Sequence, residues 1–261
     1  MKIQDFSLRK QQSEKISMVT CYDYSFAKIL DASEIDCLLV GDSAAMVMHG
    51  FSTTLNATVE LMATHTAAVA KGAPSKFVVA DLPFLAYRKD LSENMNSVGE
   101  VMRAGAQAVK LEGAKGNLQF IEHCVDSGVP VMGHLGLTPQ SVHQLGGFKV
   151  QGRDSKDHDR IFEEAQALQK AGCFSLVLEC VPAKLAGEIS KSLQVPTIGI
   201  GAGVDCDGQV LVLQDLLGMN SEFQPKFLRK YLDGFEMLKG AFNHFHRDVR
   251  SKEFPSSKES Y

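Results

Sequence analysis

Five short, largely apolar segments of this 261-residue chain each lead to an ionisable side chain, and these side chains are the ones that could do chemistry. The segments are residues 37–40, 77–80, 108–111, 129–133 and 176–178, and the side chains that follow them are Asp42, Asp81, Glu112, His134 and Glu179. A short apolar run that stops at a polar turn is typical of a strand buried on both faces of a parallel sheet. Parallel strands would gather these side chains in one ring.

Three of these side chains, Asp42, Asp81 and Glu112, are carboxylates that follow successive segments. Carboxylates that share a cavity repel one another and cannot all stay ionised without a cation. Oxygen ligands without His or Cys favour a hard ion such as magnesium, with water or substrate completing its coordination shell. The simpler alternative is that each acid caps a helix or pairs with a basic residue, but the recurrence on three segments favours the metal site.

Lys110 and Glu179 are the candidates for direct contact with a substrate. Lys110 lies two residues before Glu112, so both side chains should point to the same face of one strand. A buried lysine is costly unless it meets an acid or an anion, so it could hold a substrate carboxylate or form a Schiff base. An ion pair with Glu112 or a neighbour is the simpler alternative and could coexist with either role. Glu179 follows an apolar strand and could act as a general base, or it could cap the helix that begins near Pro182.

Ser43 and His134 are further polar candidates for the substrate site. Ser43 follows Asp42 in a glycine turn and could donate its hydroxyl or backbone N–H to a substrate oxygen. No Gly-x-Ser-x-Gly pattern surrounds Ser43, so it is not interpreted as a nucleophile. His134 is predicted to form a hydrogen-bonding wall of the substrate site rather than to shuttle protons.

Eight strand segments, most of them separated by helical segments, predict the scaffold that positions these residues. The first is expected at residues 18–23 and the last at 210–213. This alternation predicts an α/β fold with a parallel sheet, closed as a (βα)8 TIM barrel with an extra C-terminal helix. Residues 203–209 are too few for a crossover helix, so a doubly wound open sheet is the alternative. We expect a single domain over 1–261, with a polar lead-in at 1–15 and a C-terminal helix plus tail at 225–261.

The composition argues against several classes of protein. The net charge is −4, and the 27 Lys and Arg residues form no basic run, so no nucleic-acid partner is expected. No apolar segment approaches the roughly 18 residues that cross a bilayer, and residues 1–15 lack the apolar core of a signal peptide. The six cysteines show no CxxC spacing and are interpreted as buried thiols in a reducing compartment. A cytoplasmic protein without membrane contact is therefore expected.

The segment after Pro225 carries more apolar surface than the closing helix of a barrel usually needs. Its large apolar side chains are Phe227, Leu228, Tyr231, Leu232, Phe235, Leu238, Phe242 and Phe245. A contact with another subunit and a helix folded back on its own barrel are both consistent with this pattern.

Ten motifs, taken in order, resemble the ketopantoate hydroxymethyltransferase family. The resemblance covers about residue 17 to residue 230. The motifs are TCYD (20–23), GDS (41–43), HTAAV (65–69), ADLPF (80–84), MRAGA (102–106), VKLEG (109–113), GHLGLTPQ (133–140), KVQGR (149–153), LECVP (178–182) and GIGAG (199–203) with DGQ (207–209). Ala44 and Ala45 stand where the family commonly has a larger residue and a glycine. This departure could alter the loop beside Ser43 without removing a functional group.

The resemblance implies a barrel of the phosphoenolpyruvate/pyruvate superfamily that transfers a hydroxymethyl group from methylene-tetrahydrofolate to α-ketoisovalerate. The product would be ketopantoate, for pantothenate synthesis. In the family, magnesium is surrounded by the acids that match Asp42, Asp81 and Glu112. The keto acid contacts the residues that match Asp42, Ser43, Asp81 and Lys110, and the base matches Glu179. Family members form decamers in which a C-terminal helix packs on a neighbouring subunit.

Two other interpretations remain open at this point. A magnesium-dependent aldolase or lyase acting on pyruvate-like acids would need the same metal site but no folate. A barrel that has lost catalysis and serves as a binding or assembly protein is a different class, and the intact set of Asp42, Asp81, Lys110, Glu112 and Glu179 argues against it.

Overall fold

The computed structural model describes residues 1–221 and 224–261, and the chain forms two compact units. These are Met1–Val212 and Leu213–Tyr261. The first unit contains all of the candidate site residues, and the second contains the C-terminal helix. The single domain expected over residues 1–261 stays a prediction.

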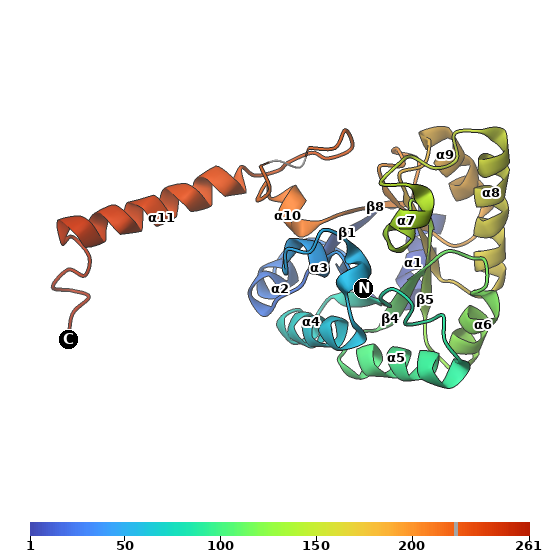
Figure 1. Cartoon of the computed structure of the whole chain (residues 1–261), viewed down its shortest axis with the longest axis horizontal. Helices are drawn as coiled ribbons and strands as arrows, with labels where there is room; N and C mark the ends of the chain where they lie inside the picture. The colour runs from blue at the N-terminus through green and yellow to red at the C-terminus, as the bar shows by residue number, and fades with distance from the viewer. Residues whose placement is uncertain (222–223) are drawn as a thin grey trace. The chain divides into compact units, whose positions relative to one another are not determined.

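Eight parallel strands form a closed barrel in the first unit (Figure 1). They are β1 (Ile16–Thr20), β2 (Cys37–Val40), β3 (Phe77–Asp81), β4 (Ala108–Glu112), β5 (Val131–Gly136), β6 (Ser175–Glu179), β7 (Thr197–Ile200) and β8 (Gly208–Leu211). Each strand pairs with its successor, and β8 closes the barrel on β1 with Val210 opposite Met18. The predicted (βα)8 barrel is confirmed, and the open sheet is excluded. Residues 201–207 join β7 to β8 without a helix, as their number predicted.

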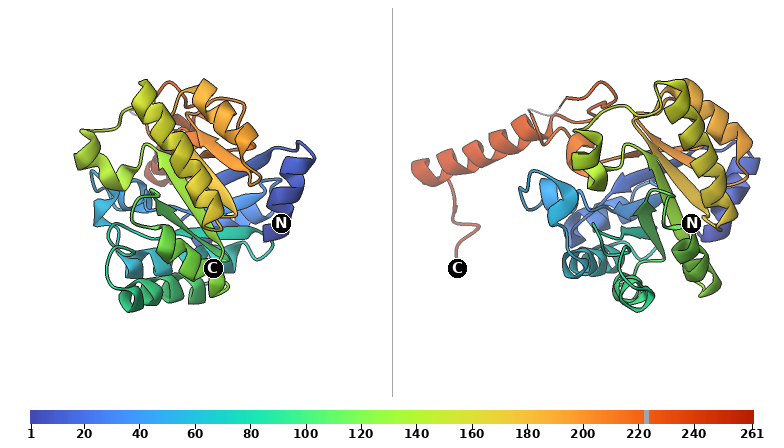
Figure 2. Two further views of the ribbon diagram at one scale, coloured as in Figure 1. Left: turned by 90° about the vertical axis from the view of Figure 1, so that its right-hand side faces the viewer. Right: turned by 45° about the vertical axis from the view of Figure 1, so that its right-hand side comes forward.

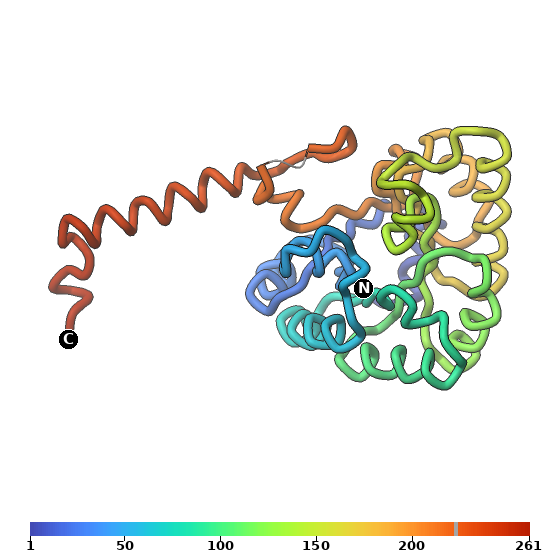
Figure 3. The backbone as a smooth tube through the Cα atoms, viewed as in Figure 1, coloured from blue at the N-terminus to red at the C-terminus, as the bar shows by residue number. Residues whose placement is uncertain are grey.

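Helices form an outer layer around the strands (Figure 2). The longer ones are α1 (Ile3–Gln11), α2 (Tyr24–Asp31), α4 (Val59–Gly72), α5 (Leu91–Arg103), α6 (Leu118–Asp126), α8 (Ser155–Lys170) and α9 (Ala183–Ser192). Short turns of helix occupy the loops after β2 and β5, namely α3 (Ala44–Val47), η1 (Thr54–Asn56), η2 (Pro139–Ser141) and α7 (Val142–Leu145). The alternation of strand and helix can be followed along the tube in Figure 3.

The length and composition of the helices determine whether any of them could cross a membrane. None of the helices within residues 1–221 or 224–261 combines the length and the apolar character required to cross a lipid bilayer.

Side-chain caps fix where the helices begin, and one of them corrects a predicted strand end. Thr58 accepts a hydrogen bond from the Leu61 N–H at the start of α4, as its position predicted (3.1 Å). Asp23, expected as the last residue of the first strand, instead accepts from the Phe26 N–H at the start of α2 (2.9 Å). The first strand ends at Thr20. Asp23 lies beyond it as the cap of α2, where its carboxylate accepts from a backbone N–H that the helix itself leaves unpaired.

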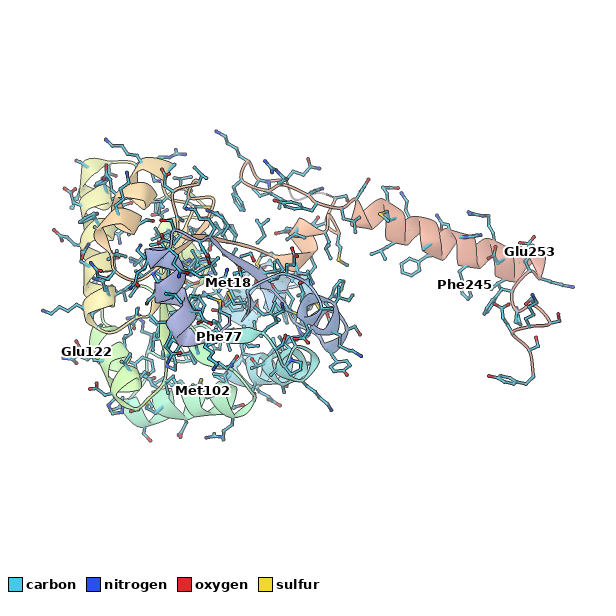
Figure 4. All side chains as sticks on the ribbon, turned by 180° about the vertical axis from the view of Figure 1, so that it is seen from behind. Met18, Phe77, Met102, Glu122, Phe245 and Glu253 are labelled. Carbon is cyan, nitrogen blue, oxygen red and sulfur yellow. The ribbon has the colours of Figure 1, made fainter. Side chains whose placement is uncertain are left out.

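The N-terminal segment is a helix that supplies part of the barrel core, which corrects the expectation of a polar lead-in at residues 1–15. Phe6 of α1 is fully buried and belongs to the same apolar cluster as Met18 and Phe77. Met18 and Phe77 are labelled in Figure 4. The ring of Phe6 contacts the rings of Phe77 and Phe174 edge to face, at centroid distances of 5.4 and 5.0 Å. The sequence signal was weak because Phe6 is the only fully buried residue of α1.

Replacing Phe6 by alanine is expected to lower the free energy of unfolding by about 3–5 kcal/mol, because it removes a buried aromatic ring and leaves a cavity. Urea unfolding followed by circular dichroism measures this loss. Leu8→Ala on the same helix is the matched control, since Leu8 is 48% exposed. Equal losses for the two variants would show that α1 does not contribute to the core as described.

The second unit contains the short helix α10 (Leu213–Leu216) and the long helix α11 (Gly234–Ser251). The C-terminal helix predicted from residue 225 therefore begins only at Gly234. Residues ahead of it bond to the end of α10 instead of to their own helix: the Tyr231 N–H donates to the Leu216 carbonyl and the Gly234 N–H donates to the Leu217 carbonyl (2.8 and 2.9 Å). These bonds cannot form in a helix that starts near Pro225.

Candidate active site

The pairing of neighbouring strands brings the predicted residues together at one end of the barrel. Asp81 of β3 lies in register with Lys110 of β4, and Glu112 of β4 lies in register with His134 of β5. Asp42 follows β2 by two residues, and Glu179 ends β6 opposite Gly136. Inward-facing side chains of a closed barrel share its interior, so register alone places these groups near one another. Apart from Glu179, all of them are almost fully buried.

An ion pair between Asp81 and Lys110 lies at the centre of this group. The Lys110 Nζ is 2.8 Å from Asp81 Oδ1, and the backbone N–H of Asp42 donates to Asp81 Oδ2 at 3.0 Å. Burial lowers the pKa of Lys110, but the charges of Asp81, Glu112 and Asp42 outweigh burial, and the net shift is upward. Lys110 is therefore a cation in this arrangement and not the neutral amine that a Schiff base requires.

Gln140 of η2 is a site residue that our sequence reasoning did not identify as functional. Its Nε2 donates to Asp42 Oδ2 at 2.8 Å, and its backbone N–H donates to Glu112 Oε2 at 3.0 Å. Its Oε1 accepts from the hydroxyl of Tyr87 at 2.7 Å. Gln140 thus holds two of the three candidate acids, Asp42 through its carboxamide and Glu112 through its backbone N–H. Its position in the GHLGLTPQ motif was the only signal that could have found it.

Gly136 allows the loop that carries Gln140 to turn over the end of β6. Its backbone φ is +93°, and a Cβ added there would lie 2.2 Å from the carbonyl oxygen of Glu179. The next residue, Leu137, donates its N–H to that same oxygen at 2.8 Å. Only glycine permits both the left-handed backbone and this close approach.

The pKa of Asp42 reflects its burial and the acids around it. Burial raises the pKa of Asp42 well above its usual range, and repulsion from Asp81 and Glu112 raises it further, while Lys110 and the Gln140 hydrogen bond oppose the shift. A buried acid that resists ionisation because other acids surround it would be relieved by a cation. The donor set of Asp42, Asp81 and Glu112 therefore fits a hard divalent ion chemically.

Within residues 1–221 and 224–261, however, no three His, Cys, Asp or Glu side chains are already arranged around one ion position. The metal role of Asp42, Asp81 and Glu112 therefore stays a prediction. In this structure Gln140 contacts one carboxylate oxygen of Asp42, and Lys110 contacts one carboxylate oxygen of Asp81.

His134 connects the acids to the predicted base. Its Nδ1 lies 3.5 Å from Glu112 Oε1, and its Nε2 lies 3.3 Å from Glu179 Oε2. Burial and the charge of Lys110 lower the pKa of His134, but the two carboxylates outweigh these effects and raise it to about 9. The Nδ1 of His134 also lies 3.3 Å from the Lys110 Nζ. His134 thus lies between two acids and contacts the Glu179 carboxylate, which is 19% exposed, at the edge of the group.

Ser43 lies beside the acids and is held by a buried phenol. Its Oγ is 2.8 Å from the hydroxyl of Tyr22, which lies in the TCYD motif and is almost fully buried. Ser43 is followed directly by α3, so Ala44 and Ala45 form the first turn of that helix and both are buried. Within this chain the departure at Ala44 and Ala45 leaves the hydroxyl of Ser43 in place.

The cysteines take no visible part in this site. All six are free, and five of them are buried, as their spacing predicted. Burial raises the pKa of Cys21 and of Cys180 to about 11, so these thiols are protonated and unreactive near neutral pH.

Replacing Gln140 by leucine is expected to leave Asp42 Oδ2 without its partner, while the Tyr87 hydroxyl keeps only its longer contacts with the backbone of Glu112. The free energy of unfolding should fall by about 1–3 kcal/mol for each buried group left unsatisfied. Urea unfolding of the purified variants measures this. Gln144→Leu is the control, because Gln144 is exposed on the adjacent α7. A Gln140→Leu variant as stable as the control would contradict the role assigned to the carboxamide.

The fold and the site define an α/β-barrel enzyme with a buried acid-and-lysine centre at the carboxyl ends of its strands. The family model described as ketopantoate hydroxymethyltransferase matches residues 1–257. The chain belongs to this family and is a hydroxymethyltransferase. It is 66% identical to the 3-methyl-2-oxobutanoate hydroxymethyltransferase of Bdellovibrio bacteriovorus, over 99% of this chain and 98% of the relative. It is 57% identical to the enzyme of the same name from Coxiella burnetii, over 98% and 96%.

Solved structures support the same architecture. A phosphonopyruvate hydrolase, in a complex with oxalate and Mg²⁺, superposes with a TM-score of 0.64 and 12% identity over 99% of this chain and 93% of its own. A 2,3-dimethylmalate lyase of the PEP mutase/isocitrate lyase superfamily superposes with a TM-score of 0.59 and 14% identity over 99% and 91%. At such low identity these two proteins bear on the fold alone.

Proposed function

We propose that this chain transfers a hydroxymethyl group from methylene-tetrahydrofolate to α-ketoisovalerate and so forms ketopantoate, the precursor used in pantothenate synthesis. The names of its relatives support ketopantoate formation. The observation that carries the proposal is the convergence of three acids and Lys110 in one buried cluster, with Glu179 at its edge. This cluster combines a site for an anionic substrate with a candidate base.

Magnesium fits this cluster by charge as well as by ligand type. Four carboxyl groups, those of Asp42, Asp81, Glu112 and Glu179, share the cluster with two basic side chains, Lys110 and His134. Burial and the neighbouring acids raise the pKa of Asp42, and a divalent cation would allow Asp42, Asp81 and Glu112 to ionise together. We propose Asp42, Asp81 and Glu112 as the residues that hold the ion. When bound, magnesium would withdraw charge from the keto acid, so that the proton on the carbon next to the carbonyl becomes easier to remove.

The remaining steps belong to side chains of the protein. Lys110 provides positive charge for the carboxylate of the keto acid and for the enolate that forms from it. Ser43 donates its hydroxyl to a substrate oxygen, while Tyr22 holds that hydroxyl in place. Glu179 takes the proton from the carbon next to the carbonyl, and His134 keeps the Glu179 carboxylate directed into the site. The enolate carbon then bonds to the one-carbon unit of the folate. The bonds between this unit and the folate nitrogens break, tetrahydrofolate leaves with protons on those nitrogens, and water supplies the hydroxyl oxygen of the product.

A turnover assay with α-ketoisovalerate tests this proposal. Ketopantoate should form only when methylene-tetrahydrofolate is present, and a chelator should stop it. Turnover of keto acids that needs no folate would instead indicate a magnesium-dependent aldolase or lyase. No turnover, together with no measurable magnesium binding, would indicate a barrel without catalysis.

We also propose that the chain forms a homo-oligomer, a decamer by analogy with the family, through the apolar face of α11. Phe235, Leu238 and Phe242 recur at helical spacing on this helix, and Phe242 is 70% exposed. A row of exposed aromatic and aliphatic side chains on one helix face is typical of a protein interface. Cytoplasmic localisation likewise stays a prediction.

Phe242→Glu is expected to reduce the assembly to smaller species, because a carboxylate cannot be buried in an apolar contact without a partner. Analytical ultracentrifugation measures the molar mass. Asn243→Glu adds the same charge at the next position of α11 and should leave the assembly intact. A mass that is equally unchanged in both variants would exclude this face as the interface.

A further inference from the structure

Two imidazoles outside the acid cluster face each other across two elements of the barrel unit. His49 follows α3, and His65 lies on α4. Their Nε2 atoms are 2.9 Å apart, and the two rings meet edge to face with centroids separated by 5.2 Å. His65 belongs to the HTAAV motif, which the proposed reaction does not use, and His49 is exposed to solvent.

The hydrogen bond made by Nδ1 of His65 determines that Nε2 is the nitrogen of this ring that can bind a metal. Its Nδ1 lies 2.5 Å from the backbone carbonyl oxygen of Tyr22. A carbonyl oxygen only accepts, so Nδ1 carries the hydrogen and Nε2 carries the lone pair. Histidines that bind metals usually donate their other N–H to a carbonyl or carboxylate in this way, which orients the ring and makes the free nitrogen more basic.

We propose that His49 and His65 form a binding site for a divalent transition-metal ion such as Ni²⁺, Cu²⁺ or Zn²⁺. Metal–imidazole bonds of about 2.0–2.1 Å, combined with the 2.9 Å separation of the two nitrogens, correspond to a ligand–metal–ligand angle of about 90°. This angle suits two neighbouring positions of a square-planar or octahedral ion. Water would fill the remaining positions, because His49 is open to solvent.

The binding step releases or relocates one proton. In the pair as it stands, His49 donates its Nε2 hydrogen to the Nε2 lone pair of His65. The metal takes both lone pairs, so the hydrogen of His49 must move to Nδ1 of the same ring or pass to the solvent. Magnesium does not compete at this site, because it prefers oxygen ligands and imidazole suits transition metals.

The position of the pair relates it to the substrate site without making it part of that site. Ser43 lies directly before α3, and His49 lies shortly after it. Tyr22 bonds to His65 through its carbonyl and to Ser43 through its phenol. An ion on the two imidazoles would therefore fasten residues 44–49 to α4. The metal site itself does not depend on the proposed reaction.

Nickel binding to the full-length chain without a histidine tag tests the proposal. The protein is freed of metals, saturated with Mg²⁺ and titrated with Ni²⁺ by calorimetry. The wild type should bind Ni²⁺ at this site, and His49→Gln and His65→Gln should each weaken this binding by at least tenfold, since each removes one of two ligands. His123→Gln should leave it unchanged, because His123 is exposed on α6, a different helix.

A spectrum separates a lost ligand from a disturbed fold. Electron paramagnetic resonance of bound Cu²⁺ should show splitting from two imidazole nitrogens in the wild type, and this pattern should be absent from both variants. Thermal melting of each metal-free variant should match the wild type, because the substitutions lie at a partly exposed pair. Nickel affinity that is the same in the wild type, His49→Gln and His65→Gln, or no binding by the wild type, would overturn the proposal. Ions held by the acid cluster would persist in both variants and are thus distinguished.

Discussion

Replacing Glu179 by glutamine is expected to abolish the exchange of the C3 proton of α-ketoisovalerate with deuterium from the solvent. The amide keeps the size of the side chain but cannot accept the proton. A positioned general base typically contributes about 10²–10⁴-fold to a rate, so the loss should be at least of this size. Proton NMR of the keto acid in D₂O measures the exchange directly and needs no folate.

The same variant should still bind the keto acid, because Lys110 and the three acids are unchanged. Glu188→Gln is the control: Glu188 pairs with His158 on the outer helices, 2.9 Å from its Nε2, and lies outside the acid cluster. Exchange at the wild-type rate in Glu179→Gln would refute the assignment of the base, whatever the rate of ketopantoate formation.

Replacing Asp81 by asparagine is expected to raise the magnesium concentration needed for half-maximal turnover by more than about tenfold, since even indirect partners of metal ligands contribute 10–100-fold to affinity. The change also removes the partner of Lys110, which lies 2.8 Å away. Loss of one member of a buried ion pair costs about 3–5 kcal/mol of stability, so the variant should also unfold at a lower urea concentration.

Two measurements separate these effects of Asp81→Asn. Initial rates over a range of magnesium concentrations report the metal requirement, and urea unfolding without magnesium reports the ion pair. Asp159→Asn on the exposed surface of α8 should change neither quantity. A variant that is less stable but has an unchanged magnesium requirement would leave Asp81 as a partner of Lys110 only and would count against its role as a ligand.

The acid cluster could be predicted from the sequence because two local signals agree: acids end the apolar strand segments, and the alternation of side chains along a strand says which residues share a face. Asp81, Glu112 and Glu179 each follow an apolar run, and each is the last residue of its strand in the structure. Lys110 and Glu112 point to the same side because side chains alternate along a strand. The count of eight strands predicts a closed parallel barrel, and in such a barrel the carboxyl ends of the strands lie together.

Gln140 and Tyr22 could not be assigned in this way. Their contacts with Asp42 and Ser43 depend on the path of loops, and loop paths follow from tertiary contacts such as the close approach of Gly136 to the end of β6. The same limit explains the late start of α11. Its apolar spacing extends back toward Pro225, but backbone hydrogen bonds to the end of α10 take the preceding residues out of the helix.

The choice among the roles considered for Lys110 also required the structure. The sequence allowed an anion contact, a Schiff base or an ion pair. The 2.8 Å distance to Asp81 shows the ion pair, and the raised pKa of Lys110 favours its charged form. Such a cation suits a substrate carboxylate and not a covalent imine.

The most direct test of the account is deuterium exchange of α-ketoisovalerate by the wild-type chain, without folate, in the presence of magnesium and again after chelation. We predict rapid exchange at C3 with magnesium, almost none with the chelator, and recovery when magnesium is restored. Exchange that continues unchanged in the chelator would contradict the claim that the acids at 42, 81 and 112 hold a cation that activates the keto acid.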